Sequence, residues 1–469
     1  MLNSGMSQNS GYQNILKRSM CLSKIDTTNL SICAVFHNGR GYDSNEFGAI
    51  GDVYIAKIGD VTQKRDYKSW EMISRAHFES LRGSFLKNKD ILMTLTGDPP
   101  DVGKVEYILN IPENSLSWNQ RVALIRYKKN GKIHNPEYLY AALLCKYCRD
   151  HIERWAKGIR QRNVGNPAVL EMLVPITSAT FQEEISNLIK TSFNKLNDSR
   201  KQYTEAEQIL LSELGLLDWK PRHQLSFIRD FSDTKTAERI DAEYYQPQYE
   251  KMVKAIKSVK DYDILDNIIT PKKCFEPGSE AYQDSGIPFT RVSNLSKFGI
   301  NDNNQQFISE DLYESLKQHQ PKKGEILLSK DATPGIAYYL KDEPKKMIPS
   351  SGVLRLTVKD TKRTYPEYLT LVLNSVIVQK QIERDVGGSI LNHWLVDQVK
   401  NTLIPILSDS IQKEISKKID ESFFAREKSK RLLEIAKQGV EMAIEKDETK
   451  AQNWINSELK KLNITLKES

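Results

Sequence analysis

Two long stretches of the chain carry mostly apolar or small residues at steps of three and four, with charged residues on the opposite face. The first stretch, residues 178–217, has this stripe at Phe181, Ile185, Leu188, Ser192, Leu196, Ser199, Tyr203, Ala206, Leu210 and Leu214. The second, residues 408–446, has it at Ile411, Ile415, Ile419, Ser422, Arg426, Ser429, Leu433, Ala436, Val440 and Ala443. The spacing predicts two long helices. Because helices this polar are marginal alone, we expect them to pack together as a coiled coil.

The two helices belong to a longer internal repeat. Three matching pairs lie 230 positions apart: VLEMLVPI and VKNTLIPI (ending at Ile176 and Ile406), FQEEISNLI and IQKEISKKI (starting at Phe181 and Ile411), and NPEYL and YPEYL (starting at Asn135 and Tyr365). Upstream, KDILMT at 89–94 matches GEILLS at 324–329, and YIAKIGDV at 54–61 matches PFTRVSNL at 288–295. The chain therefore contains two copies of one unit, each with a globular part followed by a long helix.

The globular parts alternate short strands with helices. YIAKIGDV, DILMTL and RVALIRY read as strands in the first copy, and PFTRVSNL, EILLS and VLRLTV in the second; 136–155 and 366–384 read as helices. The pattern predicts an α+β fold. We divide the chain into a first domain (1–177, its first 47 residues divergent), a long helix (178–217), a linker (218–236), a second domain (237–407), a second long helix (408–446) and a polar C-terminal tail (447–469).

Composition narrows the class of protein. With 469 residues and 39% hydrophobic residues, each half can bury its own core. The net charge of +7 is compatible with a polyanionic partner but does not show that the chain has one. No apolar run reaches the roughly 20 residues of a membrane span, and MLNSGMSQNSGYQ lacks the layout of a signal peptide. We therefore expect a cytoplasmic protein that does not interact with a membrane.

Five cysteines, an odd number in a large chain, argue against a disulfide framework. Cys145, Cys148 and His151 lie on one helical pattern, so zinc has to be considered. The matching helix of the second copy has no cysteine, and no second pair of ligands lies near by. The pattern favours a structural role and no metal site.

Candidate catalytic motifs are incomplete. GDPPDVG from Gly97 contains the D-P-P of amino-methyltransferases, but Asp101 occupies the position of the aromatic residue that stacks the flipped base. FHNGRG from Phe36 is a weak match to a glycine-rich S-adenosylmethionine loop, and no G-x-x-x-x-G-K-[ST] loop for ATP occurs. We expect no enzymatic activity from this chain alone.

The ordered series PFTRVSNL, KKGEILLS, PEYL, GGSILNHW and LIPI followed by a long amphipathic helix closely resembles the specificity subunit of type I restriction-modification systems. RIDAEYYQP at 239–247 is typical of how a target-recognition domain opens in that family. The resemblance covers about residues 54–446. The first copy departs from the family pattern because it lacks an RIDAEYY-like start.

The resemblance implies a function in phage defence. Each globular copy would be a target-recognition domain that reads one half of an asymmetric, bipartite double-stranded DNA target. The long helices would pack antiparallel and dock two modification (methyltransferase) subunits and, where present, restriction (endonuclease) subunits. S-adenosylmethionine would belong to the methyltransferase, ATP and Mg to the endonuclease, and no cofactor to this chain. A helix of about 37 residues spans roughly 55 Å, or about 16 base pairs, which suits two half-sites with an unread spacer.

Candidate DNA-binding residues lie mostly in loops. The loop KGIRQRN offers Lys157, Arg160, Gln161, Arg162 and Asn163, which suit base edges and phosphates, and its counterpart GGSILNHW offers Ser389, Asn392 and His393. The resemblance places Lys57, Lys104, Arg291, Lys330 and Thr333 toward the duplex. Solvated surface charge without a role remains the alternative for each of these residues. Trp394 reads as a core residue.

The predicted helix and partner interface comprises Ile185, Leu188, Leu196, Tyr203, Leu210, Ile415, Ile419, Leu433 and Val440. Other classes stay open at this point: a self-sufficient methyltransferase or nuclease, a non-catalytic coiled-coil scaffold, and a recognition subunit that serves a methylase-nuclease fusion. Salt-dependent DNA binding would exclude the scaffold, because phosphate contacts weaken as salt rises.

Overall fold

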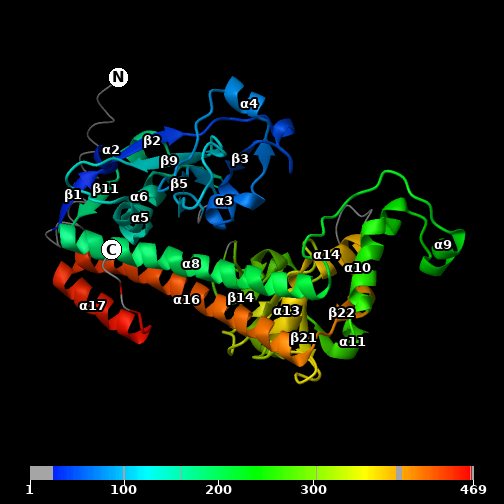
Figure 1. Cartoon of the computed structure of the whole chain (residues 1–469). Helices are drawn as coiled ribbons and strands as arrows, with labels where there is room; N and C mark the ends of the chain where they lie inside the picture. Colours follow the sequence, from blue (N-terminus) through cyan, green and yellow to red (C-terminus); the bar gives the residue numbers. More distant parts are fainter. Residues whose placement is uncertain are drawn as a thin grey trace. The chain divides into compact units, whose positions relative to one another are not determined.

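The computed structural model describes residues 25–98, 101–159, 161–302, 304–386, 393–464 and 466. The chain divides into two compact units (Figure 1). Unit 1 comprises Met1–Leu196 and Arg426–Ser469, and unit 2 comprises Asn197–Ala425. The two long helices are shared between the units, so the division does not follow the domain boundaries predicted from the sequence.

Unit 1 is built on two sheets and a strand pair. An antiparallel four-stranded sheet has the order β2 (Ala34–Asn38), β9 (Val122–Tyr127), β5 (Ile91–Thr94) and β7 (Val105–Tyr107). A three-stranded sheet has the order β4 (Met72–Ile73), β3 (Val53–Ala56) and β8 (Leu116–Trp118), with β3 parallel to β8. β1 (Asp26–Asn29) pairs with β11 (Leu173–Ile176). All but one of these pairings are antiparallel.

Unit 2 repeats the topology of these two sheets and of this strand pair. Its four-stranded sheet is β13 (Ile269–Lys273), β21 (Val353–Val358), β18 (Glu325–Ser329) and β19 (Ala337–Tyr339). Its three-stranded sheet is β17 (Gln306–Ile308), β14 (Ile287–Thr290) and β20 (Ile348–Pro349), again with one parallel pair, and β12 (Tyr262–Ile264) pairs with β22 (Leu403–Pro405). The α+β fold with two tandem copies, predicted from the sequence, is confirmed.

The repeat begins earlier in the first copy than the sequence suggested. β1, α2 (Leu30–Cys33) and β2 follow one another as β12, α11 (Leu265–Ile268) and β13 do in unit 2. Residues 26–38, which were predicted from the sequence to be divergent, therefore have the same element order as their counterparts in the second copy. Sequence similarity is lost here, whereas the strand pairing is retained.

Each helix predicted to begin at a PEYL motif is in fact two helices. Residues 136–155 form α5 (Pro136–Leu144) and α6 (Lys146–Trp155), and residues 366–384 fall in α13 (Pro366–Asn374) and α14 (Val376–Val386). The breaks lie at Cys145 and Ser375, which have extended backbone angles. Because the apolar pattern runs through both breaks, periodicity did not reveal them.

Two predicted strands end early for a local reason. YIAKIGDV continues after Ala56 as α3 (Ile58–Thr62), because the Asp60 carboxylate accepts a hydrogen bond from the backbone N–H of Lys57 at 2.8 Å. In PFTRVSNL, Asn294 accepts from the backbone N–H of Arg291 at 3.1 Å in the same way. In both cases a polar side chain accepts a hydrogen bond from the backbone N–H three residues earlier, and this bond stabilises the turn that ends the strand.

The long helices are α8 (Ala179–Glu213), of 35 residues, and α16 (Asp409–Glu445), of 37. Within unit 1, Ser192 Oγ donates to the carbonyl of Ser429 at 2.8 Å; within unit 2, Ser422 Oγ donates to the carbonyl of Ser199 at 2.8 Å. The later contact residue of α8 thus binds the earlier contact residue of α16. The two helices therefore run in opposite directions, and the predicted antiparallel coiled coil is confirmed. None of the described helices is both long and apolar enough to span a membrane.

The C-terminal segment was predicted to be a polar tail, and this prediction is wrong. Residues Glu448–Lys461 form α17, whose Ala451, Ile455 and Leu459 are buried in the core of unit 1. These three residues recur every four positions and make one narrow apolar face. The high content of polar residues around them hid that face.

Candidate nucleic-acid interface

Two loops of unit 1 are joined side by side at the end of the four-stranded sheet. The turn after β5 contains β6 (Thr96–Gly97), and the loop before α7 (Asn166–Leu170) ends in β10 (Arg162–Asn163). β6 and β10 pair antiparallel, and the N–H of Val164 donates to the carbonyl of Leu95 at 2.9 Å. Five described candidate residues of the first copy thus lie on these two connected loops: Lys104, Lys157, Gln161, Arg162 and Asn163.

The loop formed by residues 157–163 is closed tightly upon itself. Lys157 and Asn163 exchange backbone hydrogen bonds of 2.9 and 2.8 Å. Gly158 has φ +120°, and a Cβ there would lie 2.1 Å from the carbonyl oxygen of Gln161, so only glycine fits. The loop presents the exposed side chains of Lys157, Ile159 and Gln161. Arg160 lies outside the described residues.

Unit 2 has the same pair of loops. Asp331, after β18, bridges to His393, before α15 (Val396–Lys400), and the N–H of Trp394 donates to the carbonyl of Lys330 at 2.8 Å. Thr333 lies in the same turn, where its N–H bonds the carbonyl of Asp331. Lys330, Thr333 and His393 are therefore brought together. Ser389 and Asn392 lie outside the described residues.

A hydrogen-bonded side-chain pair joins the two loops in each unit. In unit 2 the Asp331 carboxylate binds Nδ1 of His393 at 3.0 Å and Nζ of Lys330 at 2.6 Å. In unit 1 the Thr96 hydroxyl donates to Oδ1 of Asn163. Thr96 and Asp331 were not singled out from the sequence, since only the strand register shows which residues oppose each other.

An open cavity of about 290 Å³ lies beside the pair in unit 2. Its lining includes Lys273, Lys330, Asp331, His393 and Trp394. Trp394 is only 1% exposed, as expected for a core residue. Two lysines and an imidazole around a hollow of this size suit a phosphate or the edge of a base.

The remaining candidates lie elsewhere or are already paired. Lys57 and Arg291 follow β3 and β14 at equivalent positions of the three-stranded sheets. Lys57 forms an ion pair with Glu71, and Arg291 donates to the carbonyl of Asn304. Lys104 forms a 2.8 Å ion pair with Asp101 in the turn after β5. DNA binding by Lys57, Lys104 or Arg291 would require some of these pairs to be exchanged for phosphate contacts.

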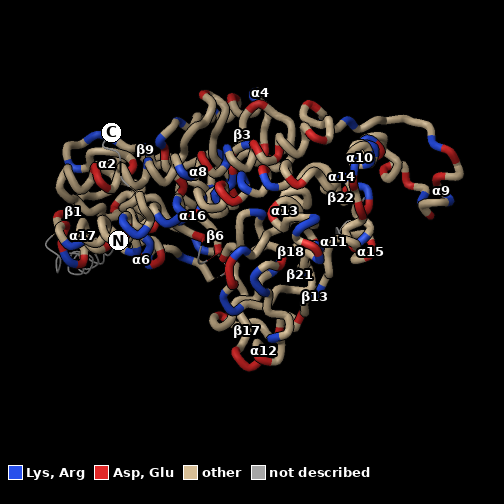
Figure 2. The backbone as a smooth tube through the Cα atoms, turned by 60° about the horizontal axis from the view of Figure 1, so that its bottom comes forward, with Lys and Arg blue, Asp and Glu red and all other residues tan. Residues whose placement is uncertain are grey.

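Burial along the helices follows the predicted interface. Ile185, Leu188, Tyr203, Leu210, Ile415, Ile419 and Val440 are buried, whereas Leu196 and Leu433 are half-buried. Lys and Arg are mixed with Asp and Glu over both units rather than gathered on one element (Figure 2). Because the basic excess is dispersed, local loop chemistry is a better guide to DNA contacts than net charge.

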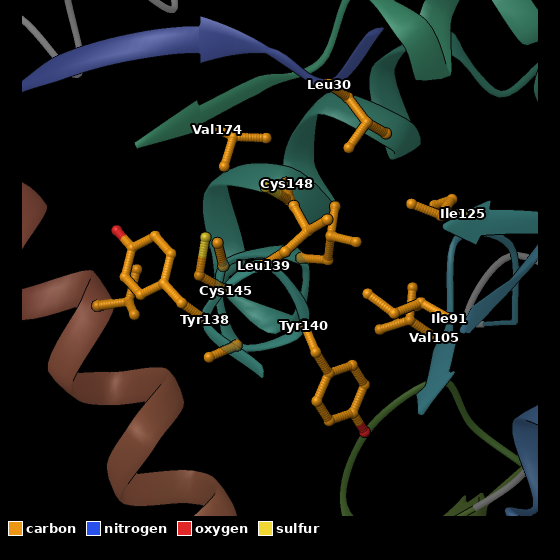
Figure 3. Close-up of a cluster of buried hydrophobic side chains, with 14 of the residues drawn as sticks. Leu30, Ile91, Val105, Ile125, Tyr138, Leu139, Tyr140, Cys145, Cys148 and Val174 are labelled. Carbon is orange, nitrogen blue, oxygen red and sulfur yellow. The ribbon is translucent and has the colours of Figure 1, made fainter. Parts of the chain in front are cut away.

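The C-x-x-C motif belongs to the core. Cys145 and Cys148 lie among apolar side chains that include Leu139 and Val174 (Figure 3). Burial raises the pKa of a third cysteine of this cluster, Cys33, to about 12, and His151 bonds the carbonyl of Ala168 at 2.7 Å. Among the described residues, no three His, Cys, Asp or Glu side chains come together as a metal site would require.

Residues 254–436 match the family model described as the type I restriction modification DNA specificity domain. This span covers most of the second copy and most of α16. The resemblance drawn from the sequence motifs is therefore confirmed for that part of the chain.

Solved structures of type I systems are also similar over nearly the whole chain. The S subunit of a type I restriction-modification system from M. genitalium is 15% identical, with a TM-score of 0.37, covering 95% of this chain and 97% of that chain. The HsdS subunit from Thermoanaerobacter tengcongensis is 13% identical, with a TM-score of 0.28 and coverages of 90% and 96%. A chain from a study of the assembly and conformational transition of the type I R-M system is 12% identical, with a TM-score of 0.28 and coverages of 93% and 97%. No curated protein matches.

Proposed function

We propose that this chain is the DNA sequence-recognition subunit of a type I restriction-modification complex. Each globular unit reads one half of an asymmetric, bipartite target. The observation that carries the proposal is that two units with one topology place different side chains on the same pair of loops: Thr96 and Asn163 in unit 1, Asp331 and His393 in unit 2. Different donors and acceptors at equivalent positions select different bases, so the two half-sites differ.

The long helices support a role in assembly. A helix of 35 residues is about 52 Å long, equivalent to roughly 15 base pairs of DNA. This length suits two half-sites that are read together across an unread spacer. Phe424 on α16 is 63% exposed, which fits docking of another protein on the helices. The partners we propose are two modification subunits and, where the system has them, restriction subunits.

In this assembly the chain contributes recognition and no chemistry. S-adenosylmethionine would be bound by the modification subunits, and ATP and Mg by the restriction subunits. The complex would act in the cytoplasm. A recognition subunit has to hold its loops in a defined geometry, and the two backbone hydrogen bonds between Lys157 and Asn163 support such a role.

The proposal is tested by purifying the chain with the modification subunit of its own system and measuring DNA affinity as a function of salt. We expect a stable complex whose affinity for DNA falls steeply as salt rises. A chain that neither associates with the modification subunit nor binds DNA would instead be a scaffold built on paired helices.

A further inference from the structure

The strand register shows which loop residues correspond in the two units. Thr94 pairs with Val122 in unit 1, and Ser329 pairs with Val353 in unit 2. Two residues beyond each of these strand ends stand Thr96 and Asp331. Their partners across the loops, Asn163 and His393, lie 230 positions apart, which is the offset of the sequence repeat. The pairs Thr96–Asn163 and Asp331–His393 are therefore structural equivalents.

The pair in unit 2 fixes the tautomer of His393. A carboxylate can only accept hydrogen bonds, so the proton in the 3.0 Å contact between Asp331 Oδ1 and His393 Nδ1 sits on Nδ1. Lys330 holds the other carboxylate oxygen at 2.6 Å and keeps the carboxylate in place. In the neutral ring Nε2 is then an acceptor, and the His393 side chain is 61% exposed.

The pair in unit 1 has the opposite effect. The Thr96 hydroxyl donates to Oδ1 of Asn163, an exposed residue, so the amide carbonyl faces Thr96 and the Nδ2 group faces away from it. The Nδ2 group of an asparagine is a donor of two hydrogen bonds. Unit 1 therefore presents a donor at the position where unit 2 presents an acceptor.

We propose that Asn163 and His393 read equivalent positions of the two half-sites with opposite hydrogen-bond polarity, and that Thr96 and Asp331 are positioning residues that set this polarity. The proposal rests on the proposed DNA-recognition function and goes beyond it by assigning base chemistry. In the major groove, only adenine N6 and cytosine N4 offer amino donors to an acceptor, whereas guanine and thymine offer O6 and O4. His393 would thus select adenine or cytosine, and Asn163 a base edge that presents an acceptor.

The test uses the full chain in complex with its modification subunit and a pool of DNA duplexes with all four bases at each half-site position. Selection and sequencing of bound DNA gives the base preference at each position. For the native chain we expect one position of one half-site to favour adenine or cytosine by about fivefold or more, the discrimination of one good base contact.

Asp331→Asn is the informative variant. The new side chain can donate to Nδ1 of His393 as well as accept from it, so Nε2 can carry a proton and bond guanine or thymine. We expect the preference at that single position to fall below about twofold, while the other half-site is unchanged. If thermal melting shows that the Asp331→Asn chain is not folded, His393→Phe is the second variant. His393 is exposed, and its replacement should abolish the same base preference.

Thr96→Val is the matched variant in unit 1, because it removes the hydroxyl and keeps the side-chain shape. It should weaken the base preference at one position of the other half-site only. Unchanged preferences in both variants, or changes spread equally over both half-sites, would overturn the assignment while leaving sequence recognition intact. A native complex that selects no sequence at all would overturn the proposed function as well.

Discussion

Buried amide side chains tie the start of each long helix to its globular unit. Gln182, fully buried in unit 1, accepts from the N–H of His134 at 2.9 Å and donates to the carbonyls of Lys132 and Thr177 at 2.8 and 3.0 Å. One side chain thereby satisfies three backbone groups from two separate segments. Each of these groups would cost about 1–3 kcal/mol if it were left buried without a partner.

Gln412 does the same in unit 2, with Tyr365, Arg363 and Leu407 as its partners. Because alanine at either glutamine would leave these groups unpaired, we predict that Gln182→Ala and Gln412→Ala each lower the free energy of unfolding by about 2–4 kcal/mol, measured by urea denaturation. Gln208→Ala, at an exposed position of α8, is the control and should cost less than about 0.5 kcal/mol. Equal effects at all three positions would contradict this role.

A buried ion pair makes the stability of unit 2 depend on pH. Glu325 and Arg355 are 3% and 2% exposed, and they form two hydrogen bonds of 2.8 and 3.0 Å. Burial acts to raise the pKa of Glu325, but the bonds from Arg355 and from the N–H of Lys322, with the charge of Lys272, outweigh it and lower this pKa. The pair therefore stabilises the fold at pH values above about 4.3, the pKa of a glutamate in the unfolded chain. This stabilisation is lost as the pH falls through the lower pKa that Glu325 has in the folded chain.

We predict that Glu325→Gln destabilises unit 2 by about 3–5 kcal/mol at pH 7, because it leaves Arg355 buried without its counter-charge. The difference between native and variant chains should stay constant above about pH 5 and shrink below about pH 4, as followed by denaturant titrations at each pH. Glu314→Gln removes an exposed ion pair with Lys317 and serves as the control. A difference that does not change with pH would contradict the prediction.

At the scale of elements, periodicity predicted the two long helices and their seam, because apolar positions recur over many turns. It failed where structure depends on a few local contacts. The breaks at Cys145 and Ser375 interrupt no apolar pattern, and α17 shows only three buried apolar positions. The tight packing of α17 also depends on Gly439 of α16, where a Cβ would lie 2.8 Å from Ile455.

The packing of α17 against α16 contributes to the stability of unit 1. Ile455→Ala should lower the unfolding free energy of unit 1 by about 2–4 kcal/mol, because it leaves a cavity beside Ile185 and Gly439. Asn456→Ala, one residue on and exposed, should have little effect on stability. Chemical denaturation of both variants measures the difference. An Ile455→Ala chain as stable as the native one would mean that residues 448–461 behave as the polar tail that the sequence suggested.

For the whole molecule, the sequence repeat predicted the existence of two copies but not how their loops meet. An offset of 230 residues is visible because the helices and the LVPI and LIPI strands kept their pattern. The pairs Thr96–Asn163 and Asp331–His393 join segments more than 60 residues apart through side chains of different chemistry. No spacing rule links such residues. The residues that we propose to read DNA are therefore the least predictable part of the chain.

Because each unit is built separately, changes in one should affect one half-site. We predict that Lys157→Ala combined with Arg162→Ala weakens recognition by unit 1 alone. If both side chains neutralise phosphates, the slope of log affinity against log salt concentration should become less steep by up to about two. Lys68→Ala combined with Lys129→Ala removes the same charge from exposed positions outside both loops. This control should leave both half-sites unchanged. Equal weakening of the two half-sites by the loop variant would contradict independent reading.

The most direct measurement of the central claim is a genome-wide map of modified bases in a methylation-free host that expresses this chain with its modification subunit. We expect one motif with two different specified halves, a fixed unread spacer between them, and methylated adenine in both halves. A continuous motif, or two identical halves, would contradict the claim that two units of one fold read two different sequences.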